Sequence, residues 1–232
     1  MRTEKMEIHS IPAVLYGEPS ETVWLFLHGQ GGCKEEAGQF AEVAAPAGDQ
    51  VLGIDLPEHG ARRDVPGFYP WVIVPELQAV LEWMQPRWKT ISLRANSIGA
   101  YFSMLALADR TIEKALFMSP VVNMEKLMLD MMNWAGVTEE QLRLKGEIPT
   151  SFGQTLSWNY LSWVREHPVS DWKTPTAVLF AGKDHLTSRE TMGNFVKDCH
   201  AALTVYEAGE HWFHTPEQLA ELRKWEQKNL AC

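Results

Sequence analysis

The chain has 232 residues and a mass of 26.3 kDa, a length that predicts one domain, or one domain with an insertion. Hydrophobic residues make up 45% of the sequence and charged residues 22%, which excludes a disordered chain, a collagen-like repeat and a coiled coil. The net charge of −9 argues against nucleic acids and anionic membranes as partners, because an acidic surface repels phosphate groups.

We expect neither a targeting segment nor a redox motif in this sequence. No run approaches the roughly 18 apolar residues that a membrane span needs, and the N-terminal dozen residues carry charges and a proline where a signal peptide would be apolar. Cys33, Cys199 and Cys232 are an odd number at irregular spacing, which fits neither a disulfide framework nor a CxxC motif. We therefore expect a cytoplasmic protein that does not span a membrane.

Short apolar runs alternate with helical segments along the chain. A strand at 8–16 is expected at an antiparallel edge, and the other expected strands are 22–27, 50–55, 90–93, 114–118, 176–180 and 203–206. The expected helices are 34–47, 72–88, 98–110, 188–200 and 215–228. This alternation predicts an α/β fold with a doubly wound, mostly parallel sheet.

Residues 121–171 interrupt the alternation, because they form a connection far longer than one crossover helix needs. The segment contains four of the ten methionines and three of the ten tryptophans. We interpret it as a helical insertion, a cap or lid on a single domain spanning 1–232. Its Met128, Met132 and Trp158 either line a substrate pocket or pack between helices, and the pattern fits both.

A nucleophile elbow is predicted at Ser97. The sequence runs from a strand through Ala95-Asn96-Ser97-Ile98-Gly99 into an apolar helix. Turning so sharply places the Ser97 hydroxyl above the sheet, and small residues two before and two after it let the helix pass close to the strand. The alternative use of such a serine is as a helix N-cap.

Three further segments follow predicted strands. His28-Gly29-Gln30-Gly31-Gly32 can turn backbone N–H groups toward a developing negative charge; a Walker-type phosphate loop would need Gly-Lys-Ser/Thr, which does not follow. Asp184 and His211 come just after two later strands. Since the carboxyl ends of parallel strands share one edge of a sheet, we expect these residues to lie near Ser97.

These residues and their order resemble the α/β-hydrolase superfamily over nearly the full length. The matching pieces are the HGQGG loop, Asp55-Leu56-Pro57-Glu58-His59-Gly60, the Ser97 elbow, and the Asp184 and His211 segments. The sequence departs from the family at Ala95 and at Glu58, where glycine is usual. The resemblance implies Ser97 as nucleophile, His211 as base and Asp184 as acid. It also implies an oxyanion hole at the backbone N–H groups of Gln30 and Ile98, with no cofactor.

Other residues compete for these roles. His214 lies three positions after His211, but no further ligand has metal-site spacing with the pair, so no metal site is expected. His185 is interpreted as a rim residue and His28 as structural. Asp55 is a less suitable acid than Asp184, and Cys33 has no neighbouring histidine that would activate it.

The sequence thus predicts a serine hydrolase acting on a small or medium, neutral carboxylic ester, with Met128, Met132, Trp158 and Trp212 as candidate substrate contacts. Alternatives within the same chemistry are a lysophospholipase- or monoacylglycerol-lipase-like activity and a thioesterase. The alternative of another class is a non-catalytic scaffold that binds a ligand. The presence of Ser97, Asp184 and His211 together favours the enzyme.

Overall fold

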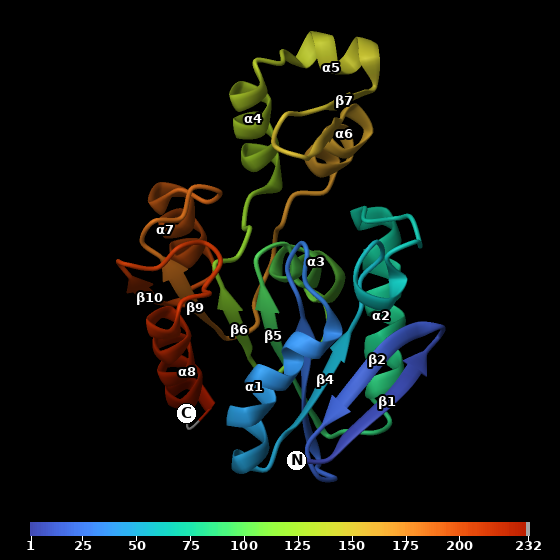
Figure 1. Cartoon of the computed structure of the whole chain (residues 1–232), viewed down its shortest axis with the longest axis vertical. Helices are drawn as coiled ribbons and strands as arrows, with labels where there is room; N and C mark the ends of the chain where they lie inside the picture. The colour runs from blue at the N-terminus through green and yellow to red at the C-terminus, as the bar shows by residue number, and fades with distance from the viewer. Residues whose placement is uncertain (231–232) are drawn as a thin grey trace.

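The computed structural model describes residues 1–230, so Cys232 lies outside the described part. An eight-stranded sheet forms the centre of the molecule (Figure 1). Its strands are β1 (Thr3–Ile8), β2 (Ile11–Tyr16), β3 (Thr22–Leu27), β4 (Gln50–Ile54), β5 (Thr90–Asn96), β6 (Ala115–Met118), β9 (Thr176–Ala181) and β10 (Ala202–Tyr206). Their order is β1-β2-β4-β3-β5-β6-β9-β10. The strands from β4 to β10 in this order pair in parallel, and β1 and β2 are antiparallel.

Helices cover both faces of this sheet. They are α1 (Ala37–Ala44), α2 (Pro70–Met84), α3 (Ile98–Leu107), α7 (Arg189–Asp198) and α8 (Pro216–Leu230), with short 3-10 turns η1 (Lys34–Glu36), η2 (Ala45–Ala47) and η3 (Gly60–Arg62). Alternate residues of β3 face opposite layers. Trp24 and Phe26 belong to the core that includes α1 and α8, whereas Val23, Leu25 and Leu27 belong to the core that includes α2 and α3. The predicted doubly wound, mostly parallel α/β fold is therefore confirmed.

Several expected boundaries are wrong in detail. The single strand expected over 8–16 is two strands, β1 and β2, joined at His9 and Ser10; both have positive φ, as a two-residue hairpin turn requires. The helix expected over 34–47 is α1 flanked by η1 and η2. The strand expected to end at position 93 continues to Asn96, because its pairing with β3 and β6 continues there.

The connection between β6 and β9 forms a separate layer above the carboxyl end of the sheet (Figure 1). It contains α4 (Met124–Ala135), α5 (Glu139–Lys145), the antiparallel strands β7 (Glu147–Pro149) and β8 (Thr155–Ser157), and α6 (Trp158–Glu166). Only helices were expected here, so the β7–β8 hairpin is a correction. We call residues 124–166 the cap. Its buried Met128, Leu142 and Leu161 join the same core as α2 and α3.

Hydropathy along the helices bears on membrane insertion. Among residues 1–230, no helix is both long and apolar enough to cross a membrane. Helices α2 and α8, which pack against the sheet, have 15 residues each. A membrane span requires roughly 20 residues.

Candidate active site

Ser97 occupies the turn between β5 and α3. Its φ of +48° and ψ of −118° lie outside the regions that L-residues favour, and such conformations cost on the order of 1–3 kcal/mol. Its N–H donates to the Met118 carbonyl at 3.0 Å and its carbonyl accepts from the Val121 N–H at 3.1 Å. Gly99 lets α3 pass close to the end of β3, since a Cβ there would lie 2.5 Å from the carbonyl oxygen of His28. This is the geometry expected of a nucleophile elbow.

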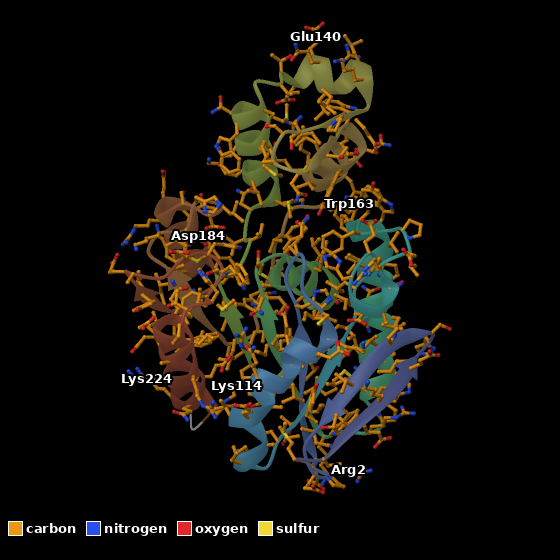
Figure 2. All side chains as sticks on the ribbon, in the orientation of Figure 1. Arg2, Lys114, Glu140, Trp163, Asp184 and Lys224 are labelled. Atoms are coloured by element: carbon orange, nitrogen blue, oxygen red, sulfur yellow. The ribbon has the colours of Figure 1, made fainter. Side chains whose placement is uncertain are left out.

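The structure brings Ser97, His211 and Asp184 together at the carboxyl end of the sheet, where Figure 2 shows Asp184 below the cap. Ser97 Oγ lies 2.8 Å from His211 Nε2, and His211 Nδ1 lies 2.7 Å from Asp184 Oδ2. The Asp184 side chain has 0% exposure. Its other oxygen, Oδ1, accepts the N–H groups of Leu186 at 2.8 Å and Thr187 at 3.2 Å. These bonds fix the carboxylate toward the imidazole, so His211 can accept a proton from Ser97 at Nε2.

His28 orients the loop that follows β3. Its ring is fully buried, and Nε2 accepts the Leu56 N–H at 3.1 Å. The hydrogen must therefore be on Nδ1, which donates to the Gly29 carbonyl at 2.7 Å. Burial lowers the pKa of His28 to about 4, so the ring is neutral near pH 7 and holds this tautomer. The structural role expected for His28 fits these contacts.

The peptide between Gly29 and Gln30 is fixed by the same contacts. The Gly29 carbonyl also accepts the Gly32 N–H at 3.2 Å. In a trans peptide the carbonyl and the next N–H point in opposite directions, so the Gln30 N–H points away from His28. Ile98 is the first residue of α3, and N–H groups in the first turn of a helix have no partner within the helix. Both residues line a hollow that also includes Ser97.

Two neighbouring cavities share lining residues next to Ser97. The triad cavity, about 480 Å³ in volume, is lined by Ser97, His211 and the loop from Gly29 to Gly32. The cap cavity, about 750 Å³, lies toward α4, α6 and the β7–β8 hairpin. Four residues line both of them: Gln30, Ile98, Leu127 and Leu186. Each volume lies within the roughly 300–1,000 Å³ that is typical of small-molecule pockets.

Of the four candidate substrate contacts, two line a cavity and two do not. Met128 lines the cap cavity, and Trp212, 72% exposed, lines the triad cavity. Met132 is buried in the core and Trp158 packs against it, and neither lines either cavity. For these two, the packing alternative fits better.

The other residues that were considered for the triad or for a metal site lie outside the Ser97–His211–Asp184 chain of contacts. Exposed His214 points its Nδ1 at the Trp212 carbonyl, 2.7 Å away. His185 lines the cap cavity, with its ring 6.5 Å from that of His211. Burial would raise the pKa of Asp55, but hydrogen bonds from Lys34 and Ala61 outweigh it and hold that pKa below its usual value.

Two further observations concern reactive groups. Burial raises the pKa of the half-buried Cys33 thiol, which disfavours its reactive thiolate. Within residues 1–230, no three His, Cys, Asp or Glu side chains are grouped so that they could hold a metal ion.

A buried ion pair behind the elbow was not predicted. Arg94 is 1% exposed and its Nε donates to Glu226 Oε1 of α8 at 2.8 Å. A second guanidinium nitrogen donates to Asn96 Oδ1 at 2.6 Å, and the guanidinium lies 5.8 Å from the Phe26 ring centroid. The pair thus ties α8 to the residue preceding Ser97. A charged residue inside a strand that was expected to be buried was the signal that could have revealed it.

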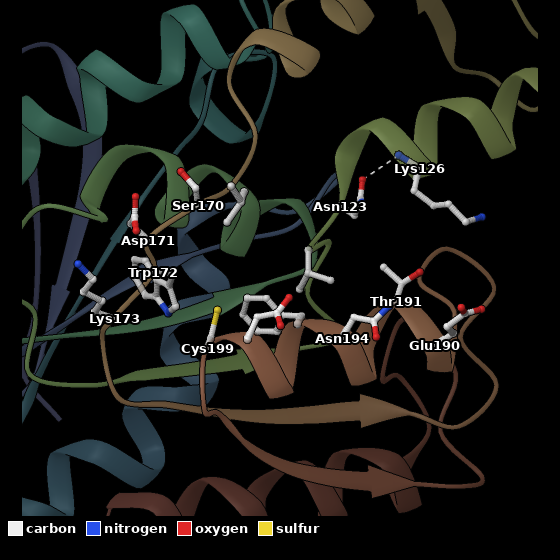
Figure 3. Close-up of a pocket in the computed structure, with 14 residues that line it drawn as sticks. Asn123, Lys126, Ser170, Asp171, Trp172, Lys173, Glu190, Thr191, Asn194 and Cys199 are labelled. Carbon is white, nitrogen blue, oxygen red and sulfur yellow. Dashed lines mark hydrogen bonds between the residues drawn. The ribbon is translucent and has the colours of Figure 1, made fainter.

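A separate polar groove lies at the base of the cap (Figure 3). It has a volume of about 650 Å³ and is lined by the start of α4, residues 169–173 and one side of α7. Asn123, Lys126 and Glu190 are among its polar side chains. None of Ser97, Asp184 and His211 lines it, so this groove is not part of the candidate active site.

Comparison with known proteins identifies the fold. No family model and no curated protein sequence matches the chain. Est1E from Butyrivibrio proteoclasticus, solved with ferulic acid bound, aligns with a TM-score of 0.78 and 18% identity over 98% of both chains. Mouse alpha/beta hydrolase domain-containing protein 10 aligns with a TM-score of 0.77 and 11% identity over 100% of this chain and 99% of that one.

A third structure agrees with these two. Monoacylglycerol lipase from Paleococcus ferrophilus aligns with a TM-score of 0.68 and 17% identity, covering 95% of this chain and 98% of the lipase. The chain therefore has the α/β-hydrolase fold, as the motifs predicted. At these identities the likeness concerns the fold, and the activity must be argued from the site.

Proposed function

We propose that the protein is a serine hydrolase that cleaves carboxylic esters through an acyl-enzyme on Ser97. The observation that carries this proposal is the pair of short contacts linking Ser97 Oγ to His211 Nε2 at 2.8 Å and His211 Nδ1 to Asp184 at 2.7 Å. Such a chain activates a serine hydroxyl for attack on a carbonyl. The esterase and lipase among the structural neighbours support the same chemistry.

The proposed reaction begins when Ser97 Oγ attacks the ester carbonyl and His211 takes the hydroxyl proton. The backbone N–H groups of Gln30 and Ile98 then stabilise the oxyanion of the tetrahedral intermediate. His211 gives the proton to the departing alkoxide, which leaves as the alcohol. Water, deprotonated by the same imidazole, next attacks the acyl group, and the acid and free Ser97 are released. Asp184 stabilises the imidazolium in both halves of the reaction.

We also propose that residues 1–232 act as one domain in which 121–171 covers the substrate. The apolar lining contributed by Leu127, Met128 and Met131 supports an acyl or alcohol group of moderate size beneath it. A coenzyme A thioester is less favoured, because the described residues lining the two cavities include neither Lys nor Arg to receive its phosphates.

The test is hydrolysis of p-nitrophenyl esters of increasing acyl length by the wild type and Ser97→Ala. Turnover by the wild type with a fall of at least about 1,000-fold in the variant is the expected result, because Ser97 supplies the nucleophile. Circular dichroism and a urea transition for both proteins control for folding. Equal turnover by the two proteins would contradict the assignment.

A further inference from the structure

The charged side chains around the cap cavity have one sign. Glu58 and Glu147 line it, and Glu36 lines the neighbouring triad cavity. No Lys or Arg is among the described residues that line either space. His185 lines the cap cavity and His211 lines the triad cavity. An anionic substrate group would therefore enter against negative charge, whereas a cation would be attracted.

Glu58 is held in place by backbone contacts. Its φ of +65° is a conformation that glycine adopts easily and that other residues adopt at a cost in free energy. Its Oε1 accepts the N–H groups of Gly67 at 2.9 Å and Phe68 at 3.0 Å. Its Oε2 accepts no hydrogen bond from the residues that the structure describes. The carboxylate is thus fixed beside Phe68 and Tyr69, with one oxygen still able to contact a ligand.

The aromatic side chains of Phe68, Tyr69 and Tyr160 also line the cap cavity. Tyr69 stacks on Trp71 with ring centroids 4.7 Å apart and an interplanar angle of 6°, and Tyr160 meets Tyr69 edge-on at 6.1 Å. Glu58, Tyr69 and Glu147 all line the cap cavity. Burial raises the pKa of Tyr69, and the negative charges of Glu147 and Glu58 raise it further. Carboxylates combined with aromatic rings are the chemistry that recognises ammonium groups.

We propose that the cap cavity selects esters that carry an ammonium group, which lies between the Glu58 and Glu147 carboxylates and the Tyr69 ring. The proposal rests on the ester hydrolysis proposed above and adds a substrate class to it. The ammonium group belongs to whichever half of the ester, acyl or alcohol, extends from Ser97 into the cap cavity. This departs from the neutral ester expected from the sequence, because a neutral ester of the same shape fits the space but gains only apolar contact.

The test compares esters that have the same shape and differ only in charge. For the alcohol half, choline butyrate is compared with 3,3-dimethylbutyl butyrate, in which carbon replaces nitrogen. For the acyl half, the methyl ester of 4-(trimethylammonio)butanoic acid is compared with methyl 5,5-dimethylhexanoate. We expect kcat/KM to be at least about tenfold higher for the cationic member of one pair, and that pair identifies the half that enters the cap cavity.

Three variants assign this preference to the cavity. Glu58→Gln keeps an oxygen that can accept the Gly67 and Phe68 N–H groups, so it removes charge without removing those bonds. We expect it and Glu147→Gln each to reduce the cation preference by about three- to fivefold, the size expected of ion pairs with exposed carboxylates. Glu140→Gln is the control, because Figure 2 shows Glu140 at the outer end of the cap; it should leave the preference unchanged.

The outcomes separate this inference from the proposed function. Hydrolysis of neutral esters that depends on Ser97, with no cation preference in either pair, would overturn the inference alone. A preference that survives both glutamate substitutions would overturn the assignment to the cap cavity. Absence of all ester hydrolysis would overturn the proposed function. In that case calorimetry on Ser97→Ala still decides the binding question: choline must bind at least about tenfold more tightly than 3,3-dimethylbutan-1-ol, and equal binding would refute the cation site.

Discussion

Replacement of His28 tests whether this buried ring positions the proposed oxyanion hole. The ring makes two hydrogen bonds. Its Nδ1 donates to the Gly29 carbonyl at 2.7 Å, and its Nε2 accepts the Leu56 N–H at 3.1 Å. His28→Asn can keep a donor near the Nδ1 position, and His28→Gln can keep an acceptor near the Nε2 position. The two variants therefore separate the contact that orients the Gln30 N–H from the contact that holds Leu56.

The structure sets the expected magnitudes. Complete loss of one oxyanion donor lowers kcat by about 100- to 1,000-fold. We expect a smaller fall of about 10- to 100-fold in His28→Gln, because the Gly32 N–H still bonds to the Gly29 carbonyl at 3.2 Å. His28→Asn should keep kcat within about threefold but lose about 1–3 kcal/mol of stability, since it leaves the buried Leu56 N–H without an acceptor.

The assay is kcat at saturating p-nitrophenyl ester together with the free energy of unfolding from urea denaturation. The positioning argument requires kcat and stability to change in different variants. If His28→Gln and His28→Asn lost kcat in equal measure, with parallel losses of stability, His28 would act only as a packing residue and the orientation of the Gln30 N–H would not depend on it.

The remaining predictions concern pH, the buried ion pair and the cap. The pKa of His28 is lowered from 6.5 to about 4, so as the pH falls the unfolded state takes up a proton before the folded state does. The free energy of unfolding measured with urea should therefore fall by about 3 kcal/mol between pH 6.5 and 4. This part of the pH dependence should be absent in His28→Gln. Arg94→Met should cost about 3–5 kcal/mol in urea unfolding by leaving buried Glu226 unpaired, and adding Glu226→Leu should recover most of it. If the double variant were as unstable as Arg94→Met alone, that reasoning would be contradicted. Gln154→Ala removes the 3.1 Å contact between the Gln154 and Gln30 side chains. It should raise KM about two- to threefold and cost no more stability than the roughly 0.5–1.5 kcal/mol that one hydrogen bond contributes. A large loss of stability would show instead that the contact holds the cap.

Local pattern in the sequence predicted the elements that have a clear period. The strand expected over 22–27 has those bounds as β3, because both of its faces are buried and its apolar run is continuous. The elbow at Ser97 was predictable because small residues must flank such a turn. The edge hairpin was harder to predict, since its turn uses His9 and Ser10 at positive φ in place of the glycine or asparagine that usually marks such a turn.

Contacts between distant segments could not be predicted from local pattern. The β7–β8 hairpin has strands of three residues each, too short to show a period of two. Gln30 and Gln154 are 124 positions apart, and Arg94 and Glu226 are 132 apart. Such pairings depend on how the cap and α8 pack against the sheet. The negative lining of the cap cavity likewise emerges only when Glu58 and Glu147 are brought to one space.

Labelling with a fluorophosphonate probe, followed by peptide mass mapping, tests the central claim most directly. We expect one equivalent of probe on Ser97 of the wild type and none on Ser97→Ala, because only a serine activated by His211 reacts rapidly with such a phosphonylating group. His211→Gln should lose the label, and His214→Gln should keep it. An unlabelled wild type, or a label on another residue that persists in Ser97→Ala, would contradict the account.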